Sequence, residues 1–143
     1  MIASNALRFA LAAAITMPAL ILGTVAPAEA FGWHRFAACD SPAVLRTITH
    51  RFSIADRNVL HRDLAIEDYY NLHQNRYMPS TDTKFIARRY CHGQVAMSDG
   101  HTRTIWFLIE SGQGFAGVGD NVEFCISGLD PWHIYGANCR SVR

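Results

Sequence analysis

A hairpin signal at Ser98-Asp99-Gly100 constrains the fold of this chain more than any other feature of the sequence. The runs on either side, Phe85–Met97 and Thr102–Glu110, have strand character. An Asp-Gly pair suits a two-residue type I′ turn, because both central residues of that turn need a positive φ. The sequence therefore predicts two antiparallel strands joined by Asp99 and Gly100.

This turn also predicts the register of the hairpin. Arg89 then lies opposite Glu110 as an opposite-charge pair, and Gly93 lies opposite Trp106, whose ring can cover the bare glycine. If Cys91 faces the helix described below, the other face carries Tyr90, His92, Gln94, Ile105, Phe107 and Ile109.

The predicted outer face is too apolar for a solvated sheet surface. Such a face indicates a partner, a ligand groove or a dimer interface. The alternative is that the C-terminal tail folds back and buries it, with Trp132 as the lid. Our candidate binding residues are Tyr90, His92, Ile105, Phe107 and Trp132.

The rest of the chain predicts one helix and two more strands. Apolar residues recur at three- and four-residue spacing between residues 42 and 61, after Ser41-Pro42, which is a typical helix start. Leu64–Leu72 and Val122–Ser127 have strand character, and a polar loop spans Gln74–Thr83. We expect an α+β fold, with one N-terminal helix packed on a four-stranded antiparallel meander.

Four cysteines in a short exported chain indicate two disulfides. In a meander the second and fourth strands are not neighbours, which disfavours Cys91–Cys125. We therefore predict Cys39–Cys91, which ties the helix start to the sheet, and Cys125–Cys139, which closes a short terminal loop.

The first thirty residues have the features of a signal peptide. Arg8 precedes an apolar run, and Ala28-Glu29-Ala30 fits the cleavage rule, so that residues 31–143 form a single mature domain. The apolar run is short for a membrane anchor and contains Pro18 and Gly23. Lipidation at Cys39 is a further alternative. The sequence thus predicts a periplasmic or secreted protein without a membrane span after cleavage.

The sequence predicts no catalytic residue, metal site or cofactor. A net charge of +1 argues against nucleic acid as a partner. Gly112–Gly117 matches G-x-G-x-x-G but runs into a strand, whereas a dinucleotide site needs a helix there. The seven histidines, which have no metal-ligand spacing, are His34, His50, His61, His73, His92, His101 and His133.

Several motifs resemble those of a family of small exported alphaproteobacterial proteins: Arg88-Arg89-Tyr90-Cys91, Ser98-Asp99-Gly100, Val122-Glu123-Phe124-Cys125, and Gly128-Leu129-Asp130 through Cys139-Arg140. This resemblance implies export and a shared fold. The order of elements is also similar to that of cystatin-like domains, with Pro131-Trp132 near the end. The inhibitory Gln-x-Val-x-Gly loop of cystatins is missing, since Gln94–Ser98 has valine one place early and no closing glycine.

From these features we expect an exported non-enzymatic domain that binds a protein or an envelope component through an apolar sheet face. The alternative function is that of a small periplasmic hydrolase, which would use histidines as general acid and base. A hydrolase should gather two or more ionisable side chains in a concave pocket, whereas a binding module should present an apolar surface.

Overall fold

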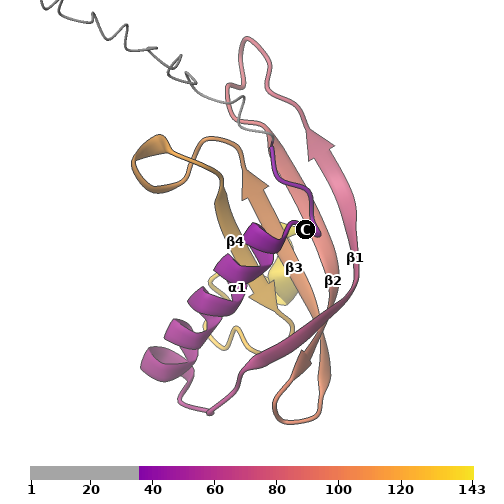
Figure 1. Cartoon of the computed structure of the whole chain (residues 1–143), viewed down its shortest axis with the longest axis vertical. Helices are drawn as coiled ribbons and strands as arrows, with labels where there is room; N and C mark the ends of the chain where they lie inside the picture. The colour runs from indigo at the N-terminus through magenta and orange to yellow at the C-terminus, as the bar shows by residue number, and fades with distance from the viewer. Residues whose placement is uncertain (1–35) are drawn as a thin grey trace, which may run out of the picture. The chain divides into compact units, whose positions relative to one another are not determined.

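The computed structural model describes residues 36–143, which form an α+β fold of one helix on a four-stranded antiparallel sheet (Figure 1). The predicted signal peptide lies outside these residues. The strand order β1-β2-β3-β4 is the predicted meander. Its elements are the helix α1 (Pro42–Ala55) with a π-helical extension η1 (Asp56–Leu60), and the strands β1 (Ile66–Met78), β2 (Arg88–Met97), β3 (Thr102–Glu110) and β4 (Asn121–Ile126).

The helix α1 lies across one face of the sheet. Residues 36–41 precede it, and proline occupies its first turn as predicted, although the Ser41 hydroxyl makes no capping hydrogen bond. Val44, Ile48 and Phe52 are buried, because their spacing places them on one helix face. The extension η1 ends at His61, which has a left-handed backbone. No helix within residues 36–143 is long and apolar enough to cross a membrane.

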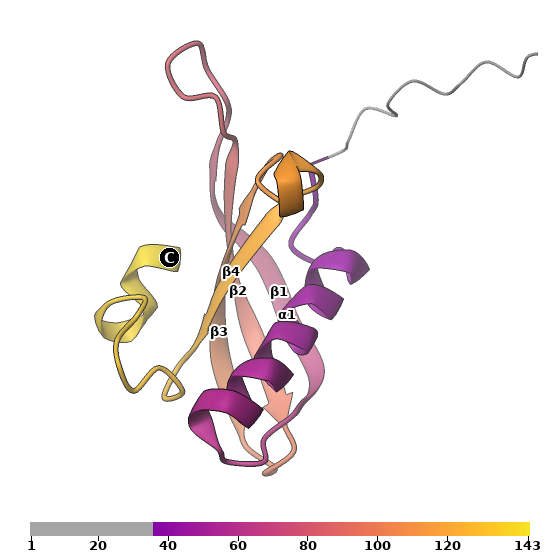
Figure 2. The same cartoon turned by 90° about the vertical axis from the view of Figure 1, so that its left-hand side faces the viewer.

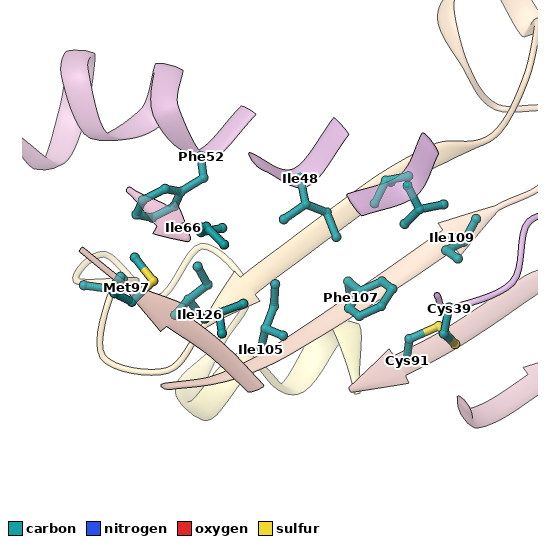
Figure 3. Close-up of a cluster of buried hydrophobic side chains, with 14 residues drawn as sticks. Cys39, Ile48, Phe52, Ile66, Cys91, Met97, Ile105, Phe107, Ile109 and Ile126 are labelled. Carbon is teal, nitrogen blue, oxygen red and sulfur yellow. A yellow bond between two sulfur atoms is a disulfide. The ribbon is translucent and has the colours of Figure 1, made fainter. Parts of the chain in front are cut away.

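The main core lies between α1 and the sheet (Figure 3). The helix contributes Ile48, which points toward Ile105 and Phe107 on β3, and Phe52, which lies beside Ile66. Ile48, Ile105 and Phe107 have no exposed surface. The core also contains Cys91, Val95, Met97, Ile109, Val122, Ile126 and Leu129.

The hairpin between β2 and β3 has a three-residue loop and not the predicted two-residue turn. The Gly100 N–H donates to the Met97 carbonyl at 2.9 Å, and the Met97 N–H donates to the His101 carbonyl at 3.1 Å. Within Ser98–Gly100 only Gly100 has a positive φ, of 77°. This is the pattern of a type I turn followed by one left-handed residue. Asp99 thereby avoids the left-handed conformation that a type I′ turn would impose.

The longer loop shifts the register by one residue, so the predicted cross-strand pairs are wrong. Arg88, and not Arg89, lies opposite Glu110, and its Nε is 2.8 Å from Glu110 Oε1. His92, and not Gly93, lies opposite Trp106. A slip of one residue moves every side chain of one strand to the other face. Ile105, Phe107 and Ile109 therefore face the helix.

The first strand is longer than predicted. Residues 74–78, expected in a loop, continue β1 and pair with β2, with Arg76 opposite Tyr90 and Met78 opposite Arg88. β2 begins at Arg88 and not at Phe85, whose side chain is exposed. β1 contains register shifts, and at one of them Leu72 covers Gly93. A Cβ on Gly93 would lie 2.7 Å from Leu72 Cδ2. Gly93 is therefore covered by Leu72, and not by Trp106 as predicted.

Both predicted disulfides are present, and the described residues contain no free cysteine. Cys39–Cys91 joins the segment before α1 to β2 on the helix side of the sheet (Figure 3). Cys125–Cys139 joins β4 to the C-terminal turn η3 (Ala137–Val142), which lies on the face opposite α1 (Figure 2). Cys139 and Val142 are buried there against Tyr90, Leu108 and Cys125. The tail thus adds a partial third layer.

Candidate functional site

A cavity of about 300 Å³ lies between the C-terminal end of the helix and the edge strand β4. We call it the β4 groove. The segment that follows β4 closes its far side. Its lining is mainly apolar and consists of Arg51, Phe52, Ala55, Val59, Leu60, Val122, Phe124, Cys125, Ile126, Leu129, Asp130, Pro131, Trp132, Ile134 and Tyr135.

The outer wall of the groove is held in place by a carboxylate. Asp130 Oδ1 accepts a hydrogen bond from the Ile134 N–H at 2.9 Å, and Asp130 Oδ2 accepts one from the Tyr135 N–H at 3.0 Å. Leu129 anchors the start of this wall in the main core. Past Tyr135 the chain continues to Cys139, which is bonded to Cys125 on β4. The segment 129–139 therefore runs around the free edge of the sheet, from the helix face to the outer face.

Some of the main-chain groups of β4 that face the groove are already engaged, including the Val122 and Ile126 carbonyls. The Ser127 N–H donates to the Thr104 carbonyl on β3. Main-chain groups alternate in direction along an antiparallel strand, so the N–H and C=O groups of Val122, Phe124 and Ile126 point away from β3.

Each of these three residues has a partner in the groove region. Arg51 Nη1 donates to the Val122 carbonyl, and the Leu129 N–H donates to the Ile126 carbonyl at 3.0 Å. The Phe124 main chain forms a hydrogen bond with the Tyr135 side chain. These contacts occupy some of the groups that an added strand would use.

The groove contains one cation, Arg51, without a carboxylate partner among the described residues. Its hydrogen bonds go to neutral acceptors, the Val122 carbonyl and Asn121 Oδ1, the latter at 3.3 Å. Burial raises the pKa of the nearby Tyr135, and Glu123 raises it further, while Arg51 lowers it. Tyr135 therefore stays a neutral hydroxyl at physiological pH.

The rim of the groove carries exposed apolar side chains. Val59 is 46% exposed, Trp132 is 60% exposed and Ile134 is 72% exposed. They lie on both sides of the opening, because Val59 comes from the end of the helix and the other two come from the segment after β4. Apolar side chains around a concave opening are typical of a binding surface.

The five predicted binding residues do not share one face. Ile105 and Phe107 are completely buried under α1, which corrects their predicted position on the outer face. Tyr90 and His92 lie on the outer face, but Tyr90 is buried with residues of the tail. Trp132 lines the β4 groove and does not act as a lid. The one-residue difference in register separates these residues.

Four side chains form a stack across the outer face of the sheet. The ring centroids of His73 and His92 are 3.6 Å apart, and those of His92 and Trp106 are 4.6 Å apart. The Arg143 guanidinium lies 4.6 Å from the Trp106 ring. Arg76 donates to the Arg143 carbonyl at 3.2 Å, which adds a contact between β1 and the tail.

This stack changes the pKa of His92. Burial lowers the pKa of His92, and the neighbouring His73 lowers it further. Its Nδ1 is buried and has no hydrogen-bond partner. A neutral imidazole is therefore the stable form of His92 in the fold.

The described residues provide little support for catalysis. They contain no group of three or more potential metal ligands. His73 and His92 are brought together, but His73 Nδ1 already pairs with the Asn71 carbonyl at 2.7 Å. Neither histidine lines the β4 groove. Within Gly112–Gly117, Gly114 has a structural role, since a Cβ there would collide with the Val118 carbonyl.

Sequence reasoning found Trp132 but missed the rest of the groove. Arg51 has the appearance of a surface position on a helix, Val59 belongs to the apolar stripe that the sequence predicts to be buried, and Tyr135 lies in a segment without periodicity. The available signal was a pair of apolar residues, Trp132 and Ile134, in a polar turn region. No protein-family model, curated protein or solved structure matches the chain, so the two family resemblances stay predictions.

Proposed function

We propose that this protein is an exported, non-enzymatic domain that binds an envelope component in the β4 groove. Its site of action would be the periplasm or the extracellular space, where the two disulfides are stable. The observation that carries the proposal is the concave, mainly apolar groove with exposed Val59, Trp132 and Ile134 at its rim.

The groove favours an apolar ligand over an added peptide strand. Strand addition needs free main-chain donors and acceptors along a sheet edge. On this side of β4 the Val122 and Ile126 carbonyls and the Phe124 main chain are engaged by Arg51, Leu129 and Tyr135. Affinity would therefore come from burial of apolar surface in a cavity whose size is at the lower end of ligand pockets.

Binding of a neutral fluorescent apolar dye, Nile red, tests the groove. Ala55 lines the cavity and is half-buried, so Ala55→Trp should fill the space and abolish dye binding. Asn58→Trp adds the same side chain at an exposed position of η1 outside the lining and should leave binding unchanged. Equal binding by all three proteins, or none by the wild type, would contradict the proposal.

Export is tested separately by fractionation and intact-mass measurement. The cleavage pattern Ala28-Glu29-Ala30 predicts a mature chain that begins at Phe31 outside the cytoplasm. A retained leader or an acylated Cys39 in the mass spectrum would contradict this part of the proposal.

A further inference from the structure

We infer that the β4 groove binds an amphiphile with one apolar chain and a carboxylate head, of the fatty-acid class, and that Arg51 holds the head. This inference rests on the proposed function and specifies the ligand of the same groove. It starts from Arg51, the one cationic side chain of the lining, which forms no ion pair among the described residues.

The lining contains two charged residues with different environments. The two oxygens of Asp130 accept the Ile134 and Tyr135 N–H groups, which orient its charge toward its own turn. Arg51 donates hydrogen bonds through Nη1, to Asn121 and Val122. Among the ion pairs that residues 36–143 form, none includes Arg51. The remaining guanidinium donors match a carboxylate.

The surrounding groups decide where the head of a ligand can lie. Arg51 lines the groove together with Tyr135, and Arg51 lowers the pKa of the Tyr135 hydroxyl whereas Glu123 raises it. Glu123 comes from the β4 position paired with Leu108, whose side chain belongs to the outer-face cluster, and Glu123 does not line the groove. A carboxylate in the groove would therefore meet Arg51 before it met Glu123.

The tail of the ligand has an apolar path past the head position. Phe52, Ala55 and Leu60 come from the helix side, and Ile126 and Leu129 come from the sheet side. Because Arg51 and the Leu129 N–H engage the Val122 and Ile126 carbonyls, a ligand without hydrogen-bonding groups along its length leaves these two hydrogen bonds intact. An acyl chain meets this condition, whereas a peptide backbone does not.

Calorimetric titration with decanoate, decanol and decyltrimethylammonium tests the ligand class, at a pH of about 7.5 where a carboxylate is ionised. Arg51→Gln should lower the affinity for decanoate about fivefold, because it removes one partly solvated ion pair. The same variant should leave the affinity for decanol unchanged and should not lower the affinity for decyltrimethylammonium. Arg51→Lys keeps the charge and should retain most of the decanoate affinity. The matched control Arg57→Gln removes an exposed cation of η1 outside the lining and should change none of the three.

The outcomes separate the ligand class from the groove itself. If none of the three amphiphiles binds the wild-type protein, the proposed function fails together with the inference. If all three bind and Arg51→Gln affects them equally, the carboxylate class is wrong while the groove stands. If Arg51→Gln does not fold, the wild-type protein still tests the carboxylate class. Added salt must then lower its affinity for decanoate and leave its affinity for decanol unchanged.

Discussion

The imidazole of His92 stacks on the indole of Trp106, with ring centroids 4.6 Å apart and ring planes 20° apart. The two residues are direct partners on β2 and β3, so both side chains lie on the outer face of the sheet. This relationship fixes Phe107 and Ile105 on the opposite face, in the core beneath α1. It also places the stack beside Arg143, so that the tail and the sheet stabilise each other.

Val142 tests whether the tail is part of the fold. Its side chain has no exposed surface, and it packs with Tyr90 and Leu108. Val142→Asp should lower the free energy of unfolding by about 2–4 kcal/mol, because it buries an unpaired carboxylate. Ala137→Asp adds the same charge at an exposed position of η3 and should have little effect. Chemical denaturation compares them, and equal stabilities would mean that the tail does not cover the outer face.

The lowered pKa of His92 predicts a loss of stability in acid. The unfolded chain takes up a proton near the ordinary value of 6.5, whereas the folded chain resists it, so stability falls as the pH drops below about 6.5. His73, Trp106 and Arg143 line the stack around it, and none of them offers a compensating negative charge. Thermal melting between about pH 7.5 and pH 5 should show the fall in wild type and a weaker one in His92→Gln. His133→Gln alters an exposed side chain and should keep the wild-type slope. An identical slope in His92→Gln would remove His92 as the cause.

The register of the hairpin can be tested with a double-mutant cycle. Arg88 Nε lies 2.8 Å from Glu110 Oε1, and these side chains are 36% and 17% exposed. Neutralising them singly and together with glutamine should give a coupling energy of about 0.5–1 kcal/mol. Arg89 instead donates to the Ala37 carbonyl, so the cycle for Arg89 and Glu110 should give almost none. The reverse result would support the two-residue turn.

The two disulfides should differ in how much they stabilise the fold. Cys39–Cys91 spans 52 residues, and Cys125–Cys139 spans 14. In the loop-entropy model, replacing each pair with serine should cost about 4 and about 3 kcal/mol respectively. Denaturant unfolding of the two double variants measures both. Loss of the second bridge should also release η3, which near-ultraviolet circular dichroism of Trp106 would report. A larger loss for the shorter loop would indicate that packing of the tail outweighs chain entropy.

The sequence by itself determined the types and order of the elements and the pairing of the cysteines. A helix of three-four periodicity, strands of period two and a Gly-containing turn are local patterns, which the surrounding fold did not override. The meander order disfavoured Cys91–Cys125, because β2 and β4 are not neighbours, and the predicted pairing of Cys39 with Cys91 is confirmed. β3 was predicted with its observed bounds. β1 was predicted to end at Leu72, but its pairing with β2 continues to Met78.

The tertiary structure alone decided which face each strand residue occupies and where the groove lies. Asp99-Gly100 is compatible with a two-residue and a three-residue loop, and alternation along a strand is the same in both registers. Packing selects the register that buries Ile105, Phe107 and Ile109 beneath α1. The β4 groove joins the end of a helix, an edge strand and a segment that wraps around that edge. No local pattern encodes this meeting, because Arg51 and Tyr135 are brought together only when the chain has folded.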